Sequence, residues 1–219
     1  MGNDFQLDRQ QPAISIAPLV KKARLDLVVL KYMAQKLYFT ISTLEQPIDS
    51  IAPLLYSIEE RHARQHRIVI YKPQELLTKD DLFFVGFVSC RQKAASQHVI
   101  DDIAQADKKM LAEIAHLPGL ISYSSMELRS GNWFNLIFFN DHDAKAHVKK
   151  QVTHTHAAYE LAPAYYAWIR LHHGLLSGGL VNREMFLQKT KYYTFPGMGR
   201  LPAMHDVIYE KMELHHSEG

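Results

Sequence analysis

The sequence predicts an α+β protein whose central part is a four-stranded antiparallel sheet with two helices on one face. Three observations predict this class. Residues 80–176 alternate between short β-branched and aromatic runs and longer segments of helical periodicity. Within them, residues 96–117 repeat their apolar side chains at spacings of three and four. Two of the strands also follow each other directly, around a short loop that contains Gly131.

The first strand and the first helix of this part have the clearest patterns. The strand Leu82–Cys90 reads LFFVGFVSC and is apolar on both faces, as a central strand is. The helix Ser96–Leu117 follows, and Pro118 and Gly119 end it. At about 100° per residue its apolar side chains fall on one stripe, formed by Val99, Ile103, Ala106, Met110, Ile114 and Leu117.

Two strands, a second helix and a last strand complete the unit. The strands are Leu120–Leu128 and Asn132–Asn140, and the last strand is Ala164–His173. The second helix is expected over Asp143–Leu161, before Pro163. Its expected core stripe is Ala144, Val148, Val152, Thr155 and Tyr159. The order is that of the ferredoxin-like βαββαβ unit, whose right-handed crossovers place both helices on one face.

The flanking regions suggest three parts: an N-terminal α+β region (1–79), the ferredoxin-like domain (80–176) and a C-terminal strand and arm (177–219). In the first part, 24–37 has a helical pattern, although 25–30 also fits a strand. The same reading makes 38–43 extended, 48–58 helical and 67–71 a strand. This part is either a degenerate second ferredoxin-like copy or a separate region. In the tail, 185–194 reads as a strand and 195–202 as an arm.

Composition limits the partners and the compartment. The formal net charge is +2, which gives no electrostatic basis for nucleic-acid binding. The longest apolar stretch, 82–88, is too short to span a bilayer, so no membrane partner is expected. Cys90 is the single cysteine, which excludes an internal disulfide and favours a reducing compartment. We therefore expect a cytoplasmic protein that binds neither nucleic acid nor membrane.

Two helices cover one face of such a sheet, so its other face must meet a partner, a ligand or water. Side chains alternate along strands. If the purely apolar sets face the helices, the open face carries an aromatic and polar set: Trp133, Asn135, Tyr166, Trp168, Arg170 and His172. A patch of this kind marks either a ligand pocket or a dimer interface. We expect a homodimer, and a pocket and an interface can coexist.

The strings PGLISYSS (118–125), NWFNLIFF (132–139) and LAPAYYAWIRLHHG (161–174) resemble a bacterial family with monooxygenase-like folds. With the element order, they make residues 80–176 similar to the dimeric α+β barrel superfamily, which includes antibiotic-biosynthesis monooxygenases and haem-degrading monooxygenases. The resemblance implies an α+β barrel, formed here by dimerisation or by a second N-terminal copy. It also implies a cavity that binds an aromatic or conjugated molecule.

Three functions follow. The first is cofactor-independent oxygenation, with His172 as base, Arg170 stabilising an enolate oxygen, Asn135 bonding the substrate and Trp133 and Trp168 stacking on it. The second is a non-catalytic ligand-binding or dimerisation module. The third, implied by the haem-degrading relatives, is haem binding at His154 or His156. No cofactor is otherwise expected. No metal site is expected either: most histidine spacings do not bring ligands together, and the i, i+4 pair His62 and His66 also fits a charged surface segment.

Overall fold

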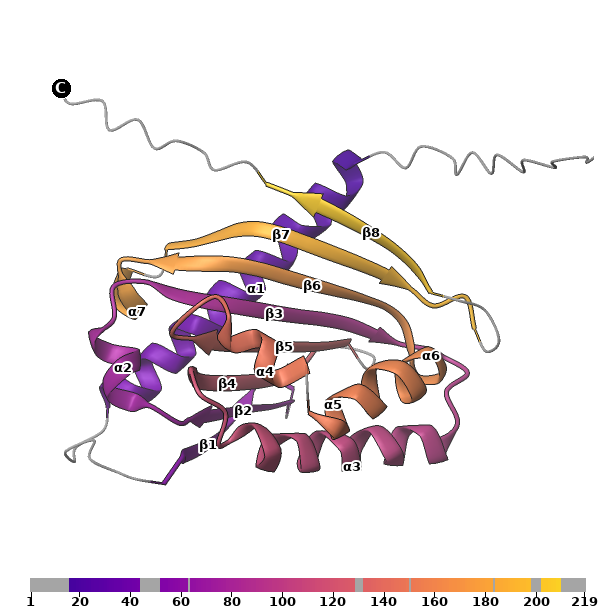
Figure 1. The fold of residues 1–219 in the computed structure, drawn as a ribbon, viewed down its shortest axis with the longest axis horizontal. Coiled ribbons are helices and arrows are strands. Elements are labelled where there is room, and N and C mark those ends of the chain that lie inside the picture. The colour runs from indigo at the N-terminus through magenta and orange to yellow at the C-terminus, as the bar shows by residue number, and fades with distance from the viewer. Residues whose placement is uncertain are drawn as a thin grey trace, which may run out of the picture.

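A computed structural model describes residues 16–43, 52–62, 64–128, 132–149, 151–182, 184–197 and 202–209. Eight strands form one antiparallel sheet in the order β1-β2-β4-β5-β3-β6-β7-β8 (Figure 1). The strands are β1 (Leu54–Glu60), β2 (Arg64–Ile70), β3 (Leu82–Arg91), β4 (Leu120–Glu127), β5 (Asn132–Phe139), β6 (Tyr166–Ser177), β7 (Glu184–Thr194) and β8 (Ala203–Ile208).

The helices lie on both sides of this sheet (Figure 1). They are α1 (Ile16–Ser42), α2 (Pro73–Thr78), α3 (Gln97–Ile114), α4 (Ala144–Lys149), α5 (Val152–His156), the π-helical turn η2 (Ala157–Leu161), α6 (Ala162–Tyr165) and α7 (Gly179–Asn182). In the described part of the chain, no helix combines the length and the apolar character that crossing a membrane requires.

The middle of the sheet confirms the predicted fold class. Strands β4, β5, β3 and β6 are neighbours in that order, which is the arrangement of a ferredoxin-like unit. Helix α3 and the segments α4 to α6 cover one face of these strands (Figure 1). Helix α3 begins after Ser96, whose hydroxyl accepts a hydrogen bond from the Val99 amide and so satisfies one of the free helical donors.

Two hairpins extend the sheet beyond this unit. β1 and β2 lie beside β4, and β7 and β8 lie beside β6. The extended reading of 38–43 is wrong, because α1 continues to Ser42, and the helical reading of 48–58 is wrong where β1 begins at Leu54. Residues 44–51, the loop 129–131 and residues 198–201 of the expected arm lie outside the described residues. Beyond the arm, the chain forms β8.

The described N-terminal elements are one long helix, a hairpin and a short helix. Their order is not strand-helix-strand-strand-helix-strand, so the alternative of a second ferredoxin-like copy is wrong for the described residues. All three sequence regions contribute strands or a covering helix to one continuous sheet. A division near residues 80 and 176 and the formation of a dimer remain predictions.

Helix α1 covers the sheet face that was expected to be open. It crosses the sheet on the side opposite α3 (Figure 1). Its apolar residues Leu30, Met33, Ala34 and Leu37 are fully buried, which confirms the helical reading of residues 24–37. They pack in one core cluster with side chains of six strands, β2 to β7, among them Phe84, Val88, Phe134, Leu136 and Phe138.

The second helix of the unit is interrupted. After α4 the chain enters α5 with an extended Gln151, continues through the π-helical turn η2 and ends in α6. The expected continuous core stripe is therefore wrong: Val152 and Tyr159 are 79% and 78% exposed, because the break rotates them outward. Pro163 does not stop the helix. It lies in the first turn of α6, where a backbone amide would have no acceptor within that helix, so its absence costs no hydrogen bond.

Candidate functional site

The register of the sheet separates the six residues that were expected to share one face. His172 lies opposite Gly86, and Gly86 lies opposite Leu136, so His172 and Leu136 point to the same side, the side of α1. Trp133 pairs with Ser89, which pairs with Ile169, and these point toward α3 and α6. The expectation of a shared face was wrong because both faces of β5 are covered by helices, and its purely apolar set packs against α1.

Trp168, Arg170 and His172 lie beneath α1. The Arg170 guanidinium donates from Nε and Nη2 to the carboxylate of Asp26 at 2.5 and 2.8 Å, and it also lies 3.8 Å from the centre of the Trp168 ring. His172 Nε2 is 2.9 Å from Asp26 Oδ2, and His172 Nδ1 is 2.9 Å from the Thr190 hydroxyl. One carboxylate of the N-terminal helix thus binds two side chains of β6.

This buried network connects distant parts of the chain, and its central side chains are closed to solvent. His172 and Thr190 are 0% exposed and Asp26 is 4% exposed. Burial by itself raises the pKa of Asp26, but hydrogen bonds from His172 and Arg170 outweigh it, and the pKa lies below its ordinary value. The ring nitrogens of His172 are both engaged, so the predicted base has no free position from which to accept a substrate proton.

Trp133, Asn135 and Tyr166 face the helices on the other side of the sheet. Tyr166 packs edge-on against Phe87 and Tyr165, at ring separations of 5.7 and 4.7 Å. Burial raises the pKa of its hydroxyl far above the usual range. Asn135 Oδ1 is buried and has no hydrogen-bond partner among the described residues. These side chains belong to the packing between sheet and helices.

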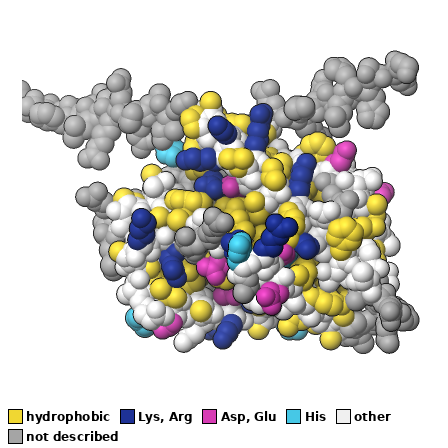
Figure 2. All heavy atoms as spheres, turned by 180° about the vertical axis from the view of Figure 1, so that it is seen from behind, with side chains coloured by type: hydrophobic (Ala, Val, Ile, Leu, Met, Phe, Trp, Pro, Cys, Tyr) yellow, Lys and Arg dark blue, Asp and Glu magenta, His cyan; other side chains and the backbone are white. Residues whose placement is uncertain are grey.

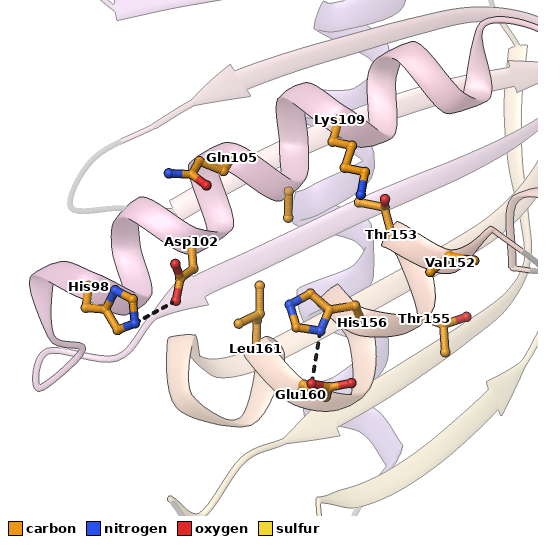
Figure 3. Close-up of a pocket in the computed structure, with 11 residues that line it drawn as sticks. His98, Asp102, Gln105, Lys109, Val152, Thr153, Thr155, His156, Glu160 and Leu161 are labelled. Atoms are coloured by element: carbon orange, nitrogen blue, oxygen red, sulfur yellow. Dashed lines mark ion pairs between the residues drawn. The ribbon is translucent and has the colours of Figure 1, made fainter.

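A groove lies between α3 and the segment formed by α5 and η2 (Figure 3). Its volume is about 730 Å³. Helix α3 supplies one wall through residues at helical spacing, and α5 and η2 supply the other. The walls are His98, Asp102, Gln105, Ala106 and Lys109 on one side, and Val152, Thr153, Thr155, His156, Glu160 and Leu161 on the other.

Each wall of the groove carries an imidazole paired with a carboxylate. His98 Nε2 is 3.4 Å from Asp102 Oδ2, and His156 Nδ1 is 3.0 Å from Glu160 Oε2 (Figure 3). The walls are tied together where the Thr153 hydroxyl donates to Glu113 of α3 at 2.5 Å. The π-helical turn η2 widens the helix beside the groove, and such turns are frequent at functional sites.

Of the predicted binding residues, the groove contains His156 but not His154, although both lie on α5. The remaining groove residues were missed. Their one signal in the sequence is the i, i+4 spacing of His98 with Asp102 and of His156 with Glu160, a spacing that is also common on solvent-exposed helices. The break that brings the two walls into position has no such signal.

The groove does not fit a porphyrin. Ala106, Val152 and Leu161 are its apolar side chains, and the others are polar or charged, whereas a porphyrin needs apolar walls along both faces. We therefore derive no step through haem. Among the described residues, no group of three His, Cys, Asp or Glu side chains could hold a metal ion.

No protein-family model matches the chain, and no curated protein matches it. Among solved structures, protein SO0527 from Shewanella oneidensis is 12% identical, with 44% of this chain and 94% of that chain covered and a TM-score of 0.36. SnoaB, a cofactor-independent oxygenase from Streptomyces nogalater, is 20% identical, with coverages of 45% and 93% and a TM-score of 0.33. A major regulator of staphylococcal pathogenesis is 11% identical, with coverages of 62% and 74% and a TM-score of 0.34. These likenesses are too distant to carry an argument about activity.

Proposed function

We propose that this protein binds a small organic molecule in the groove between α3 and the α5–η2 segment. The observation that carries the proposal is the groove itself. Its volume of about 730 Å³ falls within the range of ligand pockets, and polar groups from both walls converge on it beside a few apolar side chains. The proposal keeps the second function predicted from the sequence, ligand binding, but puts the site on the opposite side of the sheet from His172 and Arg170.

The position of Lys109 in the groove favours an organic anion with an apolar body. Asp102 and Glu160 already pair with imidazoles, whereas Lys109 forms no ion pair within the described part of the chain. The ammonium of Lys109 points across the groove toward Thr153 (Figure 3). A carboxylate or sulfonate at Lys109 would place an attached hydrocarbon or aromatic group against Val152 and Leu161.

The test uses the fluorescent anion 1-anilinonaphthalene-8-sulfonate, which combines a sulfonate with an aromatic body. We expect the Lys109→Ala variant to bind it about tenfold more weakly, because a charge-assisted contact is lost. Lys108→Ala is the matched control, because Lys108 is the neighbouring exposed lysine and does not line the groove. We expect this variant to bind the dye with an affinity within about twofold of that of the unmodified protein. Equal effects of the two substitutions, or no binding by the unmodified protein, would contradict the proposal.

Cofactor-independent oxygenation is a second candidate, favoured by one observation. His156 lies in the groove and its ring is oriented by Glu160, the arrangement of a base held by a carboxylate. The proposed ligand would then be a substrate whose proton His156 removes. Oxygen consumption in the presence of each compound that binds, compared between the unmodified protein and His156→Gln, tests this role. Binding with no oxygen uptake leaves the protein a binding module.

A further inference from the structure

The outward face of α1 carries a line of exposed apolar side chains. Leu25, Val28, Tyr32 and Phe39 are 61%, 66%, 37% and 52% exposed. They follow one another at helical spacing, on the side of α1 opposite its buried residues. We call these four residues the α1 stripe. Seen from behind, the molecule shows hydrophobic side chains with Lys and Arg side chains among them, and some Asp and Glu side chains on the same face (Figure 2).

Basic side chains border the α1 stripe on both sides. At about 100° per residue, Arg24 and Lys31 lie along one edge and Lys22 and Lys36 along the other. Lys21 lies near the start of the stripe. The single acidic residue of α1, Asp26, is on the buried side and is bound by Arg170 and His172. A neighbouring acidic group is Glu60 of β1, which accepts the Tyr32 hydroxyl at 2.5 Å and pairs with His66.

These charges argue against a second copy of the chain as the occupant. Pairing two α1 helices along their stripes, in either direction, places basic edges against basic edges. Like charges that face each other across an interface repel and therefore disfavour that pairing. The occupant must therefore present negative charge beside an apolar surface.

We propose that the α1 stripe docks on an anionic phospholipid surface. A helix that carries leucine and aromatic side chains between rows of Lys and Arg has the composition of helices that lie in the plane of a membrane interface. Negative headgroups would meet the basic edges, and Leu25, Val28 and Phe39 would enter the boundary with the acyl chains, whereas the Tyr32 hydroxyl remains bound to Glu60. The proposal departs from the expectation of no membrane partner, which rested on the absence of a membrane-spanning stretch; docking of this kind needs no such stretch. An acidic protein is less favoured, because the stripe is a ridge on an outer helix and would require a matching groove.

The experiment is co-sedimentation of the full chain with vesicles. We expect binding to vesicles of phosphatidylcholine with about one third phosphatidylserine, no binding to phosphatidylcholine alone, and release as salt rises toward 1 M, where charges are screened within about 3 Å. The Leu25→Glu variant should bind about tenfold or more weakly, since it removes an inserting side chain and adds a repelled charge.

The matched control is Leu55→Glu. Leu55 is 69% exposed, close to the 61% of Leu25, but it lies on β1 opposite Val69 and faces the other side of the sheet. This variant should bind vesicles as the unmodified protein does. Absence of binding to the anionic vesicles, or equal binding by the two variants, would overturn the proposal. So would a dimer in sizing chromatography that Leu25→Glu converts to a monomer, because the occupant would then be a second copy.

Discussion

Replacing Asp26 by alanine is expected to lower the free energy of unfolding by about 3–5 kcal/mol. The carboxylate of Asp26 is the partner of both Arg170 and His172 in a site that is almost closed to water. Alanine would leave a buried guanidinium and a buried imidazole without an acceptor, and the desolvation of such groups is not recovered elsewhere. Denaturant unfolding at neutral pH, with the slope compared between variants, measures the change.

Two further variants show that the effect comes from the network. Asp101→Ala removes an exposed carboxylate whose partner in α3 is Gln97, and it should change stability by less than about 0.5 kcal/mol. Arg170→Met combined with Asp26→Ala removes the charge pair and should recover part of the loss. A loss below about 1 kcal/mol for Asp26→Ala would mean that the ion pair contributes little to holding α1 on the sheet.

The same site predicts a pH dependence of stability. The pKa of Asp26 in the folded protein lies below its ordinary value of 3.8, because hydrogen bonds from His172 and Arg170 outweigh the effect of burial. A carboxyl whose folded pKa is depressed contributes stability that is complete above the unfolded pKa and is lost as pH falls through the folded pKa. We expect the stability difference between the unmodified protein and Asp26→Asn to be constant near neutrality and to shrink below pH 3.8. A difference that grows toward acid pH would have the wrong sign.

The pairing of Asp26 with Arg170 also shows what the sequence could and could not predict. Helical periodicity identified the buried face of α1 through Leu30, Met33 and Leu37. It could not indicate which surface that face would cover, because the decisive contact joins residues 144 positions apart. Without that contact, one face of the sheet had to be treated as open. Arg170 and His172 were predicted to be catalytic groups on that open face, but they lie beneath the N-terminal helix of the same chain.

The groove was harder to predict for a different reason. Helix α3 follows an uninterrupted period, and its start and end were placed within a few residues. The second helix changes phase at Gln151 and again through the π-helical turn η2. Periodicity assumes a constant turn, so it placed Val152 and Tyr159 in the core and could not bring His156 and Glu160 opposite α3.

Replacing Gly174 by alanine is expected to destabilise the protein by about 3 kcal/mol, at the upper end of the range for overpacking. A Cβ at Gly174 would clash with the carbonyl oxygen of Phe186 and would lie 2.5 Å from the ring of Phe84. The carbonyl belongs to β7, at the point where the β6–β7 register shifts between His173 and Gly174. A backbone atom in a paired strand cannot move aside without breaking the ladder, so the strain has no inexpensive release.

Gly86 provides the internal comparison, because it is also a strand glycine with a close neighbour. Its Cβ would lie 2.5 Å from Cδ1 of Leu30, the far end of a flexible side chain of α1. Leu30 can change rotamer, so Gly86→Ala should cost only about 1 kcal/mol. Unfolding curves of the two alanine variants test the order. A larger loss for Gly86→Ala would mean that α1 is held on the sheet more rigidly than β7 is held beside β6. The close approach of Leu30 to β3 would then limit which side chains the sheet can accommodate, and the β6–β7 irregularity would not.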